Sequence, residues 1–236
     1  MCEAEEDNIK INEAMLDNVL YVLKSAPASR LSHITLQTST KHYMGPVFDP
    51  NHSAQLVPHD PPFREDLPRL PYRTSTTRLK ISYPGSRYTW EHFCDVSDAR
   101  VLAQQHIWAA VTARGKNQAF NCTNGDVFTW KSLWKVLCDI FDLEYVPLDE
   151  NDEFDIVGMM KNKGKVWDEI VEKYGLRKTN LEEITCFEAF NNVLHFGFQH
   201  VYNMNKNREF GFFGYADTLK SINMWVGKLR DMNVIP

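Results

Sequence analysis

A proline-dense stretch in the first half of the chain limits where regular structure can form. Most of the 11 prolines fall within residues 46–84, and apolar periodicity is absent there. Proline fixes the backbone angle φ and removes an amide donor, so neither a long helix nor a central strand fits such a run. The sequence therefore predicts a long loop over residues 46–84, with helices and strands on both sides of it. Structureless stretches of this length are uncommon inside a domain. This one therefore indicates a functional loop or a segment that has lost the neighbouring parts of its fold.

Before the loop, the pattern predicts one helix followed by one strand. Met15, Leu16, Val19, Leu20 and Leu23 recur at three- and four-residue spacing, which is typical of an amphipathic helix over residues 9–23 with one buried face. Residues 32–38 then alternate between polar and apolar side chains, as a short strand does. This order is typical of an α/β fold.

After the loop, helical patterns dominate. We expect Ser97 to cap a helix, residues 119–122 to form a strand, and Asn124-Gly125 to form a turn. Further helices are predicted after the cap Thr129, over residues 167–174 before Gly175, and after the cap Asp217.

Composition and charge exclude several classes of protein. A net charge of −5 provides no basic stripe for nucleic acid. The sequence contains neither an apolar run long enough to span a membrane nor a signal-peptide pattern, so the expected compartment is the cytosol. The five cysteines and eight histidines lack metal-site spacing, and no metal is expected. Cys138 lies on an apolar helix face, where it acts as a small hydrophobic residue.

A polar cluster follows the strand predicted at 32–38. Thr38, Lys41 and Tyr43 stand where the carboxyl end of that strand would open onto a ligand crevice. Lys41 could hold a phosphate or a ribose, or lower the pKa of a neighbouring phenol, but the local pattern alone favours a solvated surface lysine. No glycine-rich phosphate loop occurs in the sequence.

Several segments, in order along the chain, resemble the plant progesterone 5β-reductase and iridoid synthase family of extended short-chain dehydrogenases. These segments are residues 36–46 (LQTSTKHYMGP), 59–62, 65–72, 95–100, 106–110 and 119–130 (AFNCTNGDVFTW). The end of the chain, with residues 211–214, Asp217, Trp225 and residues 235–236, is similar more loosely.

The resemblance implies an NADPH-dependent 1,4-reduction of steroid-like or terpenoid enones. In that family a tyrosine, assisted by the lysine that Lys41 matches, stabilises the enolate oxygen as hydride reaches the β-carbon. Prearranged donors of this kind lower the barrier by about 3–4 kcal/mol. The resemblance places Thr38 and Lys41 at the cofactor, and Phe48 and Phe190 at the substrate. Both phenylalanines are equally compatible with an ordinary core.

The sequence departs from the family at two places. The family's catalytic tyrosine belongs a few residues beyond Tyr72, where Arg73 and a run of Thr and Ser stand instead, and the match resumes near Tyr83. Tyr43, Tyr72 and Tyr83 could each be imagined as substitutes. The chain also opens just before a helix that follows the family's glycine-rich loop. We therefore expect a truncated member, impaired or inactive as it stands.

The combined expectation is an α/β protein with a partial Rossmann-type sheet and a mostly helical C-terminal substrate lobe. We expect the NAD(P)-binding region at residues 1–141, with a deletion within 46–84, and the substrate lobe at 142–236. The alternative is a non-catalytic protein that binds hydrophobic ligands or partners. An extended-type epimerase or dehydratase is a weaker alternative, since it needs the same missing cofactor loop. The sequence leaves open whether two chains form a homodimer.

Overall fold

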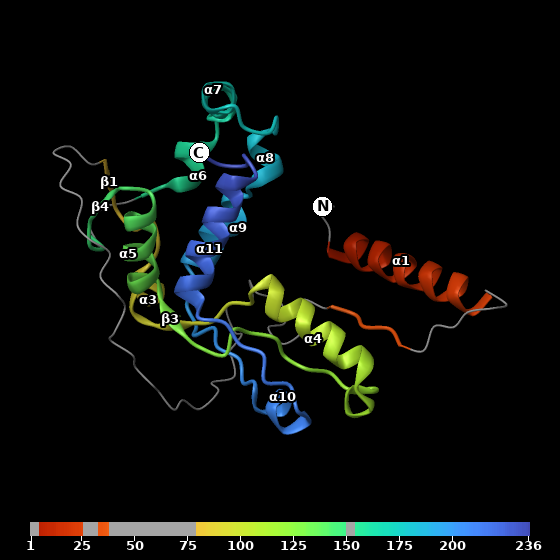
Figure 1. Ribbon diagram of the computed structural model, residues 1–236. Coiled ribbons are helices and arrows are strands. Elements are labelled where there is room, and N and C mark those ends of the chain that lie inside the picture. The colour runs from red at the N-terminus through yellow and green to blue at the C-terminus, as the bar shows by residue number, and fades with distance from the viewer. Residues whose placement is uncertain (1–4, 26–32, 38–78, 150–153) are drawn as a thin grey trace.

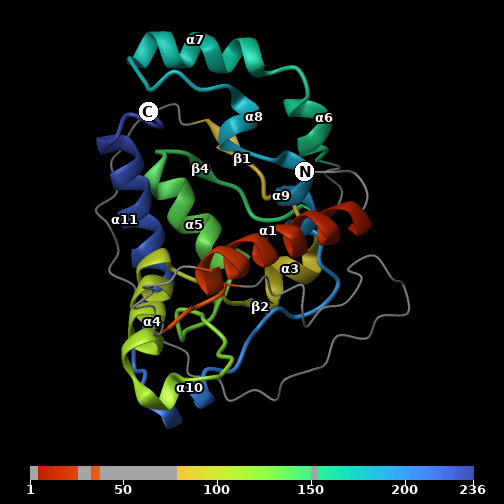
Figure 2. The same ribbon diagram turned by 90° about the vertical axis from the view of Figure 1, so that its right-hand side faces the viewer.

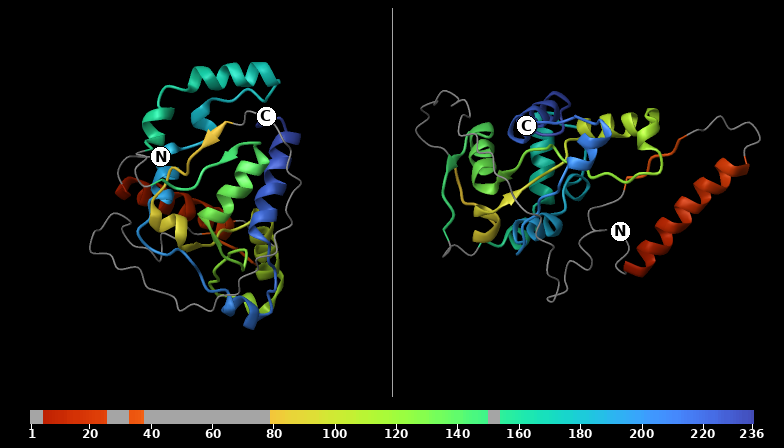
Figure 3. Two further views of the ribbon diagram at one scale, coloured as in Figure 1. Left: turned by 90° about the vertical axis from the view of Figure 1, so that its left-hand side faces the viewer. Right: turned by 90° about the horizontal axis from the view of Figure 1, so that it is seen from below.

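The computed structural model describes residues 5–25, 33–37, 79–149 and 154–236. Helix α1 (Glu5–Ser25) stands apart from the rest of these residues, as Figures 1 and 3 show from two sides. The helix predicted at 9–23 is confirmed, but its buried face is not. Met15 and Val19, for example, are 62% and 54% exposed, because no described element covers them.

The main body mixes short strands with helices. Strand β1 (Lys80–Ile81) pairs in parallel with β4 (Glu144–Tyr145), and β2 (Phe93–Cys94) pairs antiparallel with β3 (Phe128–Thr129). Cys94 also forms a parallel bridge with His200. β1 falls within the loop predicted at 46–84, so that prediction is wrong at its C-terminal end. Residues 38–78 lie outside the described part.

Most of the described residues of the body are helical. The helices in chain order are α3 (Arg87–Glu91), α4 (Ala99–Val111), the 3-10 turn η1 (Ala113–Gly115), α5 (Trp130–Ile140), α6 (Ile156–Met160), α7 (Gly164–Tyr174), α8 (Leu181–Ile184), α9 (Phe187–Leu194), α10 (Asn205–Phe210) and α11 (Thr218–Asp231). Helix α11 packs beside α5, and Figure 2 shows the two side by side.

Helix boundaries follow local capping chemistry. The Thr129 side chain accepts a hydrogen bond from the Ser132 amide and begins α5, as predicted. Gly175, at φ +62°, ends α7 in the left-handed region, where glycine is least strained. Asp217 caps α11 as predicted. The predicted cap Ser97 is wrong by one residue, because the Asp98 carboxylate accepts from the Arg100 amide.

Two predicted strands are wrong. Residues 33–37 form no strand, and Ile34 is 57% exposed. Residues 119–122 also form no strand, because side chains take up the backbone groups there: the Asn121 carbonyl accepts from Gln105 Nε2 and Asn207 Nδ2, both at 2.7 Å. A strand needs a neighbouring backbone, which an alternating pattern alone does not supply.

An aromatic core lies between α3, α5 and the two parallel strands. Tyr83 is 3% exposed, with its ring centroid 4.8 Å from that of Trp90 and 5.4 Å from that of Trp134. Cys138 is buried in the same cluster, which confirms its role as a small hydrophobic residue. The core fixes the position of residues 83–86, which follow β1.

The predicted boundary between residues 141 and 142 stays a prediction, and β1 and β4 pair across it. None of the described helices is long and apolar enough to cross a bilayer.

Candidate functional site

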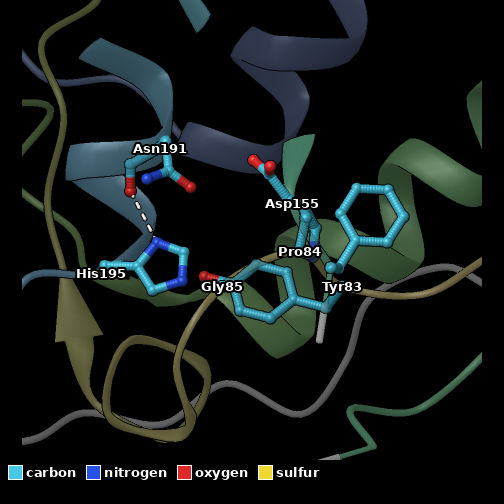
Figure 4. Close-up of a pocket in the computed structure, with 7 residues that line it drawn as sticks. Tyr83, Pro84, Gly85, Asp155, Asn191 and His195 are labelled. Atoms are coloured by element: carbon cyan, nitrogen blue, oxygen red, sulfur yellow. Dashed lines mark hydrogen bonds between the residues drawn. The ribbon is translucent and has the colours of Figure 1, made fainter. Parts of the chain in front are cut away.

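An open cavity of about 410 Å³ lies beside the turn that follows the carboxyl end of β1. In open α/β sheets this is the edge where ligands bind. Figure 4 shows His195 on one side of the cavity, with Asp155, Pro84 and Tyr83 on the other. The residues that line it are Tyr83, Pro84, Gly85, Phe154, Asp155, Asn191 and His195.

One wall of the cavity is held by the carbonyl oxygen of Leu194. This oxygen accepts from the Ser86 amide at 3.0 Å and from Thr89 Oγ1 at 2.5 Å. A Cβ added to Gly85 would lie 2.7 Å from the same oxygen, so only glycine fits there without a shift. The close approach at Gly85 therefore serves the packing of residues 83–86 against α9.

The phenol of Tyr83 is hydrogen-bonded within the protein. Its hydroxyl lies 3.0 Å from Thr89 Oγ1, whose own proton is directed to a carbonyl oxygen, so the phenol is the donor of this pair. Burial raises the pKa of Tyr83. A phenol whose proton is already donated, and which ionises less readily than usual, is a poor substitute for a catalytic tyrosine.

The polar groups at the cavity come from α9 and from the start of α6. Asn191 and His195 are four residues apart and therefore share one side of the helix end. Nδ1 of His195 lies 2.8 Å from the Asn191 carbonyl oxygen, the contact dashed in Figure 4. Asp155 caps α6, with Oδ1 accepting from the Gly158 amide at 2.9 Å.

Of the predicted site residues, only Phe190 lies within the described part of the chain; Thr38, Lys41 and Phe48 lie outside it. Phe190 does not line the cavity. It packs against the aromatic core, with its ring centroid 6.3 Å from that of Trp130. Its role at the substrate stays a prediction.

Sequence reasoning missed Asp155, Asn191 and His195. The spacing of Asn191 and His195 on one helix face was a signal that could have been read. Asp155 approaches them only through the packing of α6 against α9. Among the described residues, no cluster of His, Cys, Asp or Glu has the arrangement of a metal site.

A second pair of titratable side chains, Asp95 and His200, lies at the end of β2. Asp95 is 5% exposed, and burial raises the pKa of its carboxyl group to about 7, against a hydrogen bond from the Tyr202 amide. His200 Nδ1 lies 3.8 Å from Asp95 Oδ1, and burial lowers the pKa of this imidazole. These residues do not line the cavity, and they join β2 to residues 200–202.

Comparison with known proteins shows the family to which the chain belongs. Residues 72–236 match the PRISE-like Rossmann-fold domain. The chain belongs to this family. The match confirms the expected fold class, a partial Rossmann-type α/β protein with a helical lobe, and it confirms the resemblance found in the sequence.

Individual relatives extend the match to almost the whole chain. A 3-oxo-Delta(4,5)-steroid 5-beta-reductase of Arabidopsis thaliana is 33% identical over 287 residues, which cover 99% of this chain and 72% of the relative. An (S)-8-oxocitronellyl enol synthase of Catharanthus roseus is 34% identical over 281 residues, covering 98% and 71% respectively. Since both alignments are longer than the 236 residues of this chain, the relatives carry segments inside the matched region that this chain lacks.

Rossmann-fold reductases use a nicotinamide cofactor, so membership implies one. The turn after β1 does not fit its pyrophosphate group. Gly85, the glycine in the turn after β1, is closed off by Leu194 and Tyr83, and α3 beyond it is only five residues long and is capped by Ser86. A pyrophosphate cradle needs open backbone amides at a helix start, which this turn does not offer.

Proposed function

We propose that this protein is a reductase of the conjugated double bond in steroid-like or terpenoid enones, with NADPH as the hydride donor. The support comes from relatives of this activity that match along nearly the whole chain. Lys41 is proposed to assist at the developing enolate oxygen, with Thr38 beside it at the cofactor. Phe48 and Phe190 are proposed to contact the apolar body of the substrate. The cytosol stays the predicted compartment.

We further propose that the chain as given is impaired. Two observations support this: the alignments open gaps in it, and Tyr83 has its proton committed to Thr89. Loss of one strong donor at an oxyanion typically costs about 10²–10³ in turnover. The non-catalytic alternative gains no support from the family match.

The test is NADPH oxidation measured with progesterone and with 2-cyclohexen-1-one, beside the Arabidopsis relative as reference. We expect turnover about 10²–10³ below that of the relative, in line with one missing donor. Lys41→Met should lower the residual rate further. Lys116→Met is the matched control, because Lys116 is an exposed lysine that directly follows η1. Rates equal to the relative's would contradict the impairment. A chain that neither reduces an enone nor changes NADPH fluorescence would contradict the proposed activity.

A further inference from the structure

The end of the molecule formed by α10 and the turn η1 carries exposed positive charge. Arg114 on η1 donates from Nη2 to the Glu209 carbonyl oxygen of α10 at 3.1 Å, which joins the two elements. Figures 1 and 2 both show α10 beside the C-terminal end of α4, at the opposite end of the molecule from α7. Arg114, Lys206 and Arg208 are exposed here, and none of them forms an ion pair with a carboxylate of the described residues.

Aromatic rings hold two of these cations in place. Lys206 Nζ lies 5.2 Å from the ring centroid of Phe120 and 5.7 Å from that of Phe210. Arg114 Cζ lies 5.6 Å from the Phe210 centroid, so this one ring brings both cations to the same place. A ring attracts a cation without neutralising it. The positive charge therefore stays available to an anion outside the protein.

The carboxylates in the neighbouring sequence leave this positive charge exposed. Both oxygens of Asp126 accept from Thr218, from its amide at 2.8 Å and from its Oγ1 at 2.6 Å, so this half-buried group faces the start of α11. Asp217 pairs with Lys220, whose Nζ lies 3.1 Å from Oδ2. On α10 itself, Glu209 is the exposed carboxylate, and the exposed cations outnumber it.

Two exposed aromatic side chains extend from the loop that follows α10. Phe213 is 73% exposed and Tyr215 is 79% exposed. Tyr215 belongs to the same surface as Arg208, because a Cβ added to Gly125 would lie 3.6 Å from Arg208 Nη2 and 3.8 Å from Tyr215 Cβ. Transfer of such rings from water into an apolar phase is favourable. This end of the molecule therefore offers both positive charge and apolar rings to a partner.

An anionic lipid bilayer provides the counterpart of both features. Its headgroups carry negative charge, and each Lys or Arg near such a surface strengthens binding by about fivefold. The boundary between headgroups and acyl chains takes up aromatic rings, and the amphipathic ring of Tyr215 suits this boundary. An acidic peptide would supply the charge but no apolar phase for Phe213. Three cations are also too few for the basic stripe that nucleic acid requires.

We propose that the surface formed by Arg114, Lys206, Arg208, Phe213 and Tyr215 binds the headgroup region of an anionic phospholipid membrane. The binding is peripheral: the cations contact headgroups, the two rings insert between them, and no segment crosses the bilayer. The whole chain has a net charge of −5, so the acidic remainder favours an approach through this end. The inference does not depend on the proposed function, because no substrate, cofactor or turnover enters it.

Co-sedimentation of the full chain with lipid vesicles tests the proposal. Vesicles of phosphatidylcholine with about 30% phosphatidylserine should bind it about 10²-fold more tightly than phosphatidylcholine alone, since three cations contribute about fivefold each. Raising NaCl from about 0.1 M to about 1 M shortens the Debye length from about 10 Å to about 3 Å and should remove most of this preference. Equal binding to both kinds of vesicle, or binding to neither, would overturn the proposal. So would binding to polyglutamate without binding to the vesicles.

Charge variants test whether this end of the molecule is responsible. Lys206→Gln combined with Arg208→Gln should weaken binding to the phosphatidylserine vesicles about 25-fold, which is about fivefold for each charge removed. Lys165→Gln combined with Lys178→Gln is the matched control, because Lys165 lies on α7, Lys178 lies between α7 and α8, and both are exposed. The control should bind like the wild type. An equal loss in the two double variants would overturn the assignment to α10.

Aromatic variants test the insertion of the rings. Phe213→Ser should weaken the same binding by about 10-fold and leave its salt dependence unchanged, because it removes apolar area and no charge. Tyr174→Ser is the matched control: Tyr174 is 54% exposed on α7, and Lys173 Nζ lies 5.2 Å from its ring centroid. It should bind like the wild type, and thermal unfolding should confirm that both variants are folded. Wild-type binding by folded Phe213→Ser would overturn the proposed insertion.

Discussion

The carboxylate of Asp98 shows how one buried side chain can join two helices that are distant in sequence. It caps α4 and accepts from the Arg100 guanidinium at 2.9 Å, while Trp225 Nε1 and Ser221 Oγ donate to it from α11. The side chains of Asn124 and Thr218 continue this buried network. Sequence patterns located the helices, but they gave no sign that Asp98 connects them.

We expect Asp98→Ala to lower the free energy of unfolding by about 3 kcal/mol, because buried Ser221, half-buried Trp225 and the Arg100 amide lose their acceptor at once. Urea unfolding followed by circular dichroism measures this loss. Asp217→Ala, which removes a partly exposed cap of α11, is the control and should cost about 1 kcal/mol. Equal losses for the two variants would contradict the role of Asp98.

The pH dependence of this contribution has a definite sign. The hydrogen bonds from Arg100, followed by those from Ser221 and Trp225, lower the pKa of Asp98 against the opposing effect of burial. The stabilisation is therefore present above the ordinary carboxyl pKa of about 4 and is lost as the pH falls below it. Wild-type protein should lose more stability in acid than Asp98→Asn does.

Asp95 should behave in the opposite way. Burial raises its pKa to about 7, so the folded state binds more protons than the unfolded chain between about pH 4 and pH 7. Stability should fall as the pH rises through this window, by no more than about 4 kcal/mol, since one pKa unit corresponds to about 1.4 kcal/mol. Asp95→Asn keeps an acceptor for the Tyr202 amide and should flatten the dependence in urea unfolding from pH 4 to pH 8. An unchanged slope would show that Asp95 is charged throughout.

At the level of elements, the clearest sequence predictions were those with a local cause. Thr129, Gly175 and Asp217 bound their helices as predicted, because capping and left-handed glycine depend on residues a few positions away. The strands at 32–38 and 119–122 were mispredicted because pairing depends on distant backbone. The short strands that do form, such as β1 and β4, contain too few residues for their periodicity to be read.

Two glycines in helices should respond oppositely to the same substitution. Gly175→Ala places a side chain at φ +62° and should destabilise the protein by about 1 kcal/mol. Gly227 lies inside α11 with no atom within 4 Å of an added Cβ, so Gly227→Ala should stabilise it by about 0.5–1 kcal/mol. Thermal unfolding of both variants measures the difference, and shifts in the same direction would contradict the assigned backbone conformations.

On the scale of the whole molecule, α1 and the body differ in what they bury. Val19 is 54% exposed on α1, whereas Leu194 is fully buried beneath the cavity wall. We expect Val19→Asp to change the free energy of unfolding by no more than about 0.5 kcal/mol, and Leu194→Ala to lower it by about 3 kcal/mol. Urea unfolding compares the two. A large loss at Val19 would mean that another surface covers α1.

The sequence by itself determined the family, the principal helices with most of their caps, and the mismatch with the family beyond Tyr72. These properties depend on residue identity and short spacing, which the chain carries locally. Only the tertiary structure decided that the Tyr83 hydroxyl is hydrogen-bonded to Thr89, that the apolar side of α1 is exposed, and that α6, α9 and the turn after β1 border an open cavity. Each of these depends on which distant residue occupies the neighbouring space, and packing settles that only when the whole chain has folded.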